Sequence, residues 1–210
     1  MIKFQMVALV LVVLLVGTFS SAAHAKTSGS LLDDVVALKL GLAGYVIGKK
    51  IGPDQEEIAE KHPVEGAYEG TYKFSDNDLY VVVDSKTDRV LALYKQKKDA
   101  DKDQLKAMVV ELMGSFDAPT TMAHDKILYW AFNKHGAVSE DIFNQAKKIQ
   151  QTADLDIIAT VKLNSEMEIS PDPKEQEEGV GKKKDSATGA IYFIITSDPL
   201  VKEFMVAHPQ

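Results

Sequence analysis

The chain has 210 residues, of which 45% are hydrophobic and 26% charged, and its formal net charge is −7. This composition is that of a globular protein, and it excludes disordered, collagen-like and multi-span membrane proteins. The chain contains no cysteine, which excludes disulfides, thiolate nucleophiles and Cys-ligated metal sites. The acidic balance argues against broad binding to the phosphate backbone of nucleic acids.

Residues 1–25 have the pattern of a secretory signal peptide. Lys3 precedes an unbroken apolar run, Met6–Val16, and a stretch of small residues then ends in Ala23-His24-Ala25. As a helix the apolar run is roughly 16 Å long, well short of the ~30 Å hydrocarbon core of a bilayer. We predict cleavage after Ala25, with a cut after Ala23 as the alternative, and no transmembrane span in the mature protein. The sequence thus predicts a bacterial periplasmic or secreted protein, folded as one domain over residues 26–210.

The first half of this domain predicts a helix and a three-stranded meander. Leu31–Ile51 begins with helical spacing but has glycines in its second half, so it is left open between helix and strand. Asp54–Lys61 follows a proline and predicts a short helix. The predicted strands alternate apolar and polar residues or are continuously apolar, and their short turns make them antiparallel neighbours: Tyr68–Phe74, Leu79–Val83 and Arg89–Gln96.

The second half predicts further helices and strands around two loops. A charged loop is expected over Lys97–Asp103, followed by a helix whose apolar stripe starts at Leu105 and which Gly114 ends. Glu166–Thr188 is expected to be a flexible loop, because it offers little to bury. The remaining predictions are strands at Ile127–Phe132, Leu155–Leu163 and Ala190–Thr196, a helix from Ser139 to about Gln150, and a last helix opening at Asp198-Pro199.

These elements predict an α+β fold, with an antiparallel sheet of about six strands and helices mainly on one face. Two stretches, Asp54–Gln96 and Asp103–Leu163, each place a helix before strands. This shared plan is consistent with a duplicated helix-plus-meander unit.

Two segments within this plan resemble known periplasmic domains. Leu112–Phe132 (LMGSFDAPTTMAHDKILYWAF) resembles a helix end, a Gly/Pro loop and a Trp-bearing strand, and Leu79–Gln96 (LYVVVDSKTDRVLALYKQ) a closing strand–turn–strand. The order is similar to that in accessory lipoproteins of outer-membrane barrel assembly and in the β-lactamase-inhibitor-protein fold, over about Asp54–Leu163. The resemblance implies a non-catalytic binding module. The chain departs from those proteins in having neither a lipidated cysteine nor disulfides.

Motifs for known chemistries are incomplete or missing in the sequence. Asp99-x-Asp101-x-Asp103 begins like a calcium loop, but Gln104 and Val110 stand where glycine and a bidentate acid are needed. His124 and His135 fall at opposite ends of one predicted strand, too far apart to share a zinc ion. Neither a nucleophile-elbow serine motif nor a P-loop occurs. We predict no catalytic, cofactor or metal site, with an enzyme site assembled from distant acids and histidines as an alternative.

Aromatic residues on the predicted strands are the strongest remaining signal, because Tyr and Trp are favoured anchors where an apolar surface meets a partner. The candidate partner-binding residues are Tyr68, Tyr72, Tyr94 and Trp130. The resulting hypothesis is a binding or accessory protein of the cell envelope, whose partner is a protein or a small ligand. A membrane-attached oligomer through residues 31–52 is a further alternative, since Gly44, Gly48 and Gly52 form a ladder that permits close helix contacts.

Overall fold

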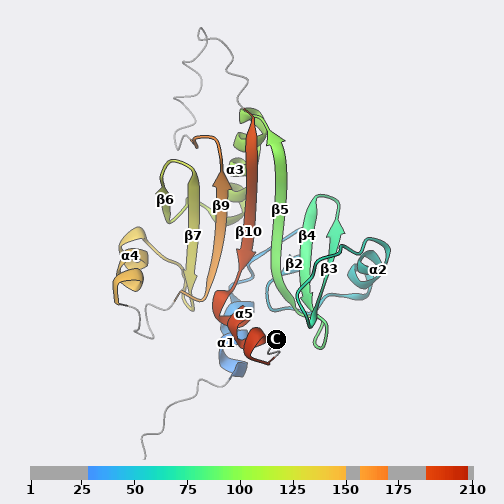
Figure 1. Ribbon diagram of the computed structural model, residues 1–210. Helices are drawn as coiled ribbons and strands as arrows, with labels where there is room; N and C mark the ends of the chain where they lie inside the picture. The colour runs from blue at the N-terminus through green and yellow to red at the C-terminus, as the bar shows by residue number, and fades with distance from the viewer. Residues whose placement is uncertain (1–27, 150–156, 170–187, 208–210) are drawn as a thin grey trace, which may run out of the picture.

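The computed structural model describes residues 28–149, 157–169 and 188–207 (Figure 1). The expected cleavage sites at Ala23 and Ala25, and most of the expected loop 166–188, lie outside these ranges. Within them the helices are α1 (Ser28–Ala37), α2 (Pro53–Lys61), α3 (Lys102–Phe116), α4 (Glu140–Ile149) and α5 (Asp198–Ala207). The strands are β1 (Gly41–Leu42), β2 (Tyr45–Val46), β3 (Thr71–Asp76), β4 (Leu79–Asp84), β5 (Val90–Ala100), β6 (Thr121–Ala123), β7 (Ile127–Asn133), β8 (Gly136–Ala137), β9 (Ala159–Ser165) and β10 (Gly189–Thr196).

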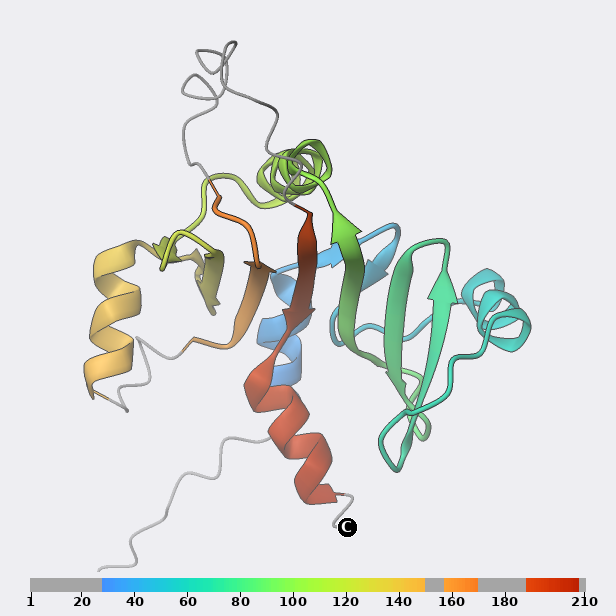
Figure 2. The same ribbon diagram turned by 45° about the horizontal axis from the view of Figure 1, so that its top comes forward.

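Eight strands form one antiparallel sheet in the order β3-β4-β5-β10-β9-β7-β6, and β8 also pairs with β7. The predicted α+β class is confirmed. All six predicted strands are present, and the two additional ones, β6 and β8, are short strands that flank β7. The sheet consists of two meanders, β3–β4–β5 and β7–β9–β10, that meet at the β5–β10 pair. The strand order is therefore symmetric about that pair, whereas the helices do not repeat: α2 packs beside β3, and α3 packs against one face of the sheet (Figure 2).

That face carries the hydrophobic core. One cross-strand row runs through Phe74, Val81, Leu93, Ile195, Val161 and Trp130, and each of these side chains is at most 1% exposed. Three elements cover this row: α1 with Leu31 and Val35, the β1–β2 hairpin with Tyr45, and α3 with Leu112. In Figure 1 these elements lie behind the sheet. We call this side of the sheet the core face.

The undecided segment 31–52 contains both helix and strand. α1 ends at Ala37 and the β1–β2 hairpin follows. Its glycines permit close approach within the chain itself: a Cβ on Gly41 would lie 1.9 Å from the Tyr45 carbonyl oxygen. Gly48 has a φ of +81°, and a Cβ there would lie 2.9 Å from Cγ2 of Val36. Several apolar side chains of this segment, which the alternative hypothesis assigned to a membrane or oligomer surface, lie in the core of the same chain: Val35, Leu40, Tyr45 and Ile47.

Three sequence predictions are wrong in detail. β5 continues through the expected charged loop to Ala100, because pairing with β10 extends that far and buries Ala100. α3 passes Gly114 and ends at Phe116, whose ring packs edge-on against Phe132. The expected loop after Glu166 begins with buried Met167 and Ile169 rather than with solvated chain.

The predicted helix starts after Ser139 and at Asp198 are confirmed. The Ile142 backbone N–H donates to Ser139 Oγ at 3.4 Å. In α5 the capping oxygen comes from Ser197, which accepts from the Leu200 N–H at 3.3 Å.

Candidate binding surface

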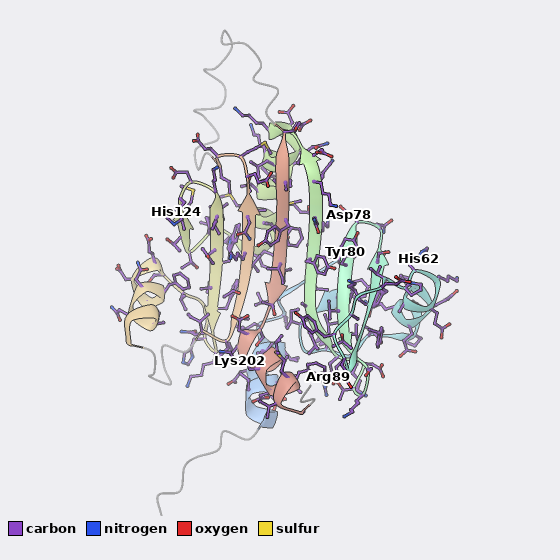
Figure 3. All side chains as sticks on the ribbon, viewed as in Figure 1. His62, Asp78, Tyr80, Arg89, His124 and Lys202 are labelled. Atoms are coloured by element: carbon purple, nitrogen blue, oxygen red, sulfur yellow. The ribbon has the colours of Figure 1, made fainter. Side chains whose placement is uncertain are left out.

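The second face of the sheet, which we call the open face, presents tyrosines over its central strands. Successive strand residues alternate between faces, so the row next to the core row points the opposite way. The register places Tyr80, Tyr94, Ile194, Lys162 and Tyr129 in one line across β4, β5, β10, β9 and β7. We call these five residues the open-face row. Figure 3 shows Tyr80 on β4, on the side of the sheet turned toward the viewer.

Only the β7 end of the open face is covered by a described helix. Phe143 of α4 packs on Tyr129 with ring centroids 5.9 Å apart, and Ala131, Val138 and Phe143 form a small buried cluster there. Over β4, β5 and β10 the side chains stay partly exposed, and Tyr192 is 42% exposed. The tyrosine-bearing part of the open face is therefore accessible.

Tyr80 and Tyr94 stack on each other, with centroids 4.8 Å apart and an interplanar angle of 15°. Burial and, next, the neighbouring Tyr80 raise the pKa of Tyr94, so its hydroxyl stays protonated and can donate a hydrogen bond. Within the described ranges, neither of these hydroxyls, nor that of Tyr192, has a hydrogen-bond partner. Their polar ends are free to bond a partner or water.

The tyrosines on the core face behave differently. The Tyr45 hydroxyl donates to Asp76 at 3.0 Å, and the Tyr72 hydroxyl donates to Asp88 at 3.3 Å. Burial, the charge of Asp88 and the hydrogen bond to it raise the pKa of Tyr72 to about 12. These two hydroxyls are hydrogen-bonded within the fold, unlike those of Tyr80, Tyr94 and Tyr192.

Two polar groups interrupt the apolar part of the open face. Lys162 Nζ lies 5.4 Å from the centroid of the Tyr129 ring, and no described carboxylate forms an ion pair with it. Asn164 lies two residues further along the same face of β9, where it pairs with Tyr192. Its Nδ2 is buried and has no hydrogen-bond partner among the residues that the structure describes. A buried donor without an acceptor costs free energy, so such a group is a candidate for recognition.

The four residues selected from the sequence do not come together. Tyr94 belongs to the open-face row, whereas Tyr68 is 71% exposed in the loop before β3. Tyr72 packs on Phe74 at the core face. Trp130 is 1% exposed, and its Nε1 donates to the Asp117 carbonyl at 2.9 Å, so its ring belongs to the core and cannot contact a partner.

Sequence reasoning missed Tyr80, Tyr192, Ile194 and Lys162 as members of one surface. The alternation within each strand identifies which residues share a face. Only the pairing of β10 with β5, which are far apart in sequence, brings the two halves of the surface together.

Among the described residues, the alternative site types gain one depression that holds a histidine and an acid, His62 and Asp76, and no metal site. His62 and His124 lie on opposite sides of the molecule (Figure 3), and the described ranges contain no group of three or more His, Asp or Glu side chains that could hold a metal ion. A shallow depression of about 270 Å³ between α2 and β3 is lined by Ile58, His62, Ser75, Asp76 and Asn77. It brings neither His124 nor His135 to an acid.

None of the helices in the described part of the chain has the length and apolar character needed to cross a bilayer. Comparisons of the chain with protein-family models, with curated proteins and with solved structures found no match.

Proposed function

We propose that the protein is a non-catalytic binding or accessory protein of the bacterial cell envelope, and that its partner docks on the open face. The observation that carries the proposal is the open-face row, where Tyr80 and Tyr94 lie next to Ile194 and their hydroxyls have no hydrogen-bond partner among the described residues. Partly exposed tyrosines on a rigid sheet lose little side-chain freedom when they bind, which makes them effective interface anchors.

A protein partner is better supported than a small ligand. Small-molecule sites are concave and bury most of the ligand's surface. The depression beside α2 reaches the open face only at Ser75, the cross-strand partner of Tyr80, and its lining is mainly polar. A flat face of about 19 Å across five strands, from the ~4.8 Å spacing of neighbouring strands, suits a partner large enough to cover it.

The proposal of export rests on the signal-peptide pattern of residues 1–25. Its test is cell fractionation followed by intact mass measurement of the protein. We expect an envelope or secreted fraction that contains residues 26–210 or 24–210. A protein that keeps Met1 in that fraction, or that stays in the cytoplasm, would contradict export.

Docking on the open face can be tested by site-specific photocrosslinking in the native cells. A benzophenone amino acid replaces Tyr192 on the open face or, as a matched control, Val110, which is 60% exposed on α3. We expect position 192 to give a discrete crosslinked species that position 110 does not give. Equal crosslinking at the two positions, or none at position 192, would overturn docking on this face.

A further inference from the structure

The open face carries two lysines that form no ion pair with a described carboxylate, and this bears on the chemistry of what it can bind. Lys162 lies in the open-face row between Ile194 and Tyr129, and Lys73 lies on the same face of β3, opposite Val82. Neither lysine forms an ion pair with a described carboxylate. The chain as a whole is acidic, with a net charge of −7, whereas Lys162 and Lys73 place two positive charges on this face.

Asn164 adds a second, independent observation. Its unpartnered Nδ2 lies beside Lys162 on β9, at a spacing of roughly 6.6 Å for residues two apart in a strand. Both groups are hydrogen-bond donors, and neither can accept through the atom concerned. A carboxylate of a partner satisfies Lys162, and its hydrogen bonds to a cation are stronger than those of a neutral acceptor; it can reach Nδ2 of Asn164 only if the side chains that cover this atom move.

A second copy of this chain is a poor occupant. A two-fold contact between open faces would place two copies each of Lys162 and Lys73 in one interface. Like charges that meet in an interface disfavour association.

Addition of a partner strand at the edge beside the open face is also obstructed. The Val64 N–H donates to the Lys73 carbonyl at 2.8 Å, and the Ser75 N–H donates to the His62 carbonyl at 3.0 Å. Residues 62–64 thus already occupy the outer side of β3, including a bridge between Pro63 and Phe74. A partner must approach the face rather than this edge.

We infer that the open face binds a segment of another protein that presents apolar side chains to Tyr80, Tyr94 and Ile194 and a carboxylate to Lys162. This inference rests on the proposed function and specifies the chemistry of its partner. The apolar side chains supply the buried area, and the carboxylate fixes the orientation and excludes basic segments.

The test uses a displayed library of random 16-residue peptides, selected on the purified protein. We expect the enriched peptides to combine aromatic or aliphatic residues with Asp or Glu and to be depleted of Lys and Arg. Affinities of the enriched peptides are then measured by fluorescence anisotropy against variants. Lys162→Glu should weaken binding about tenfold or more, whereas the matched charge change Lys202→Glu on α5 should alter it by less than about twofold.

Two face variants separate the inference from the proposed function. Ile194→Asp, and Tyr192→Ser in case the first fails to fold, should abolish binding of the enriched peptides, with folding checked by the fluorescence of Trp130. Peptides that depend on Ile194 or Tyr192 but show no acidic bias, and no response to Lys162→Glu, would overturn the inference and leave docking on the open face intact. Three outcomes would overturn both the inference and the proposed docking on the open face. They are peptides whose binding none of these variants changes, a library without enrichment, and self-association of the protein through this face.

Discussion

Two neighbouring cross-strand rows of the same sheet have opposite roles. The row from Phe74 to Trp130 is at most 1% exposed and lies under α1, α3 and the β1–β2 hairpin. The open-face row, one residue away on each strand, contains tyrosines and a lysine and is covered by a described helix only at β7. The core-face row stabilises the fold because its side chains are buried, whereas the open-face row keeps apolar area and hydroxyls accessible. The comparison shows that a single strand pattern can specify a buried core on one face of a sheet and an accessible apolar surface on the other.

The largest expected difference between the faces is found at two adjacent residues of β10. Phe193 is fully buried on the core face, and Tyr192 is 42% exposed on the open face. We expect Phe193→Ala to lower the free energy of unfolding by about 3–5 kcal/mol, because it removes buried area and leaves a cavity. Tyr192→Ala should lower it by less than about 1 kcal/mol. Urea unfolding followed by Trp130 fluorescence measures both, and comparable losses at the two sites would show that the open face is also a core.

A smaller difference is expected at alkaline pH. Burial, followed by the interaction with Asp76 or Asp88, raises the pKa of Tyr45 and of Tyr72 above 10, to about 12 for Tyr72. A raised pKa in the folded state means that the stability contributed by the neutral hydroxyl is fully present below pH 10. It is lost as the pH rises through about 12. We expect the free energy of unfolding to fall between pH 10 and 12, and Tyr72→Phe to reduce that fall.

At pH 8 the same substitution should cost about 0.5–1.5 kcal/mol, because it removes one hydrogen bond. The matched control is Phe74→Leu, a core-face neighbour that removes no hydroxyl. It should lower stability by similar amounts at pH 8 and pH 11.5. A pH profile of Tyr72→Phe parallel to that of the wild-type protein would contradict the role assigned to the hydrogen bond with Asp88.

Local patterns predicted the elements better than they predicted the surface. Period-two alternation and continuous apolar runs predicted the six main strands, because the apolar positions of a strand follow which of its faces are buried. The β1–β2 hairpin could not be predicted from its own sequence. Its conformation depends on Gly41 and Gly48, whose backbones approach Tyr45 and Val36, and such contacts are tertiary. The length of β5 was missed for a similar reason, since its charged end is held by pairing with β10.

The candidate surface required information that single segments do not contain. Aromatic content alone predicted Tyr72 and Trp130 as binding residues, yet both contact the core. Trp130 can be buried there because its indole N–H donates a hydrogen bond to the Asp117 carbonyl. The sequence gives no direct indication that Tyr94 stands beside Ile194, which is 100 residues further along the chain. Residue type therefore identified candidate binding residues, and only the strand order shows which of them share one surface.

The smallest expected effect concerns the layer that covers the core face. Gly114 lies in the last turns of α3, and a Cβ at this position would meet nothing within 4 Å. Because glycine weakens a helix interior by roughly 0.5–1 kcal/mol relative to alanine, Gly114→Ala should raise the free energy of unfolding by about that amount. The contrasting variant Gly48→Ala should destabilise the protein, since it combines a φ of +81° with a 2.9 Å approach to Val36.

A loss of stability in Gly114→Ala would indicate that the helix ends at this glycine, and Phe116 would then not be held against Phe132 as part of the layer that covers the core face. If instead stability rises while peptide binding stays unchanged, the covering layer and the open face are energetically separate, as the comparison of the two rows requires.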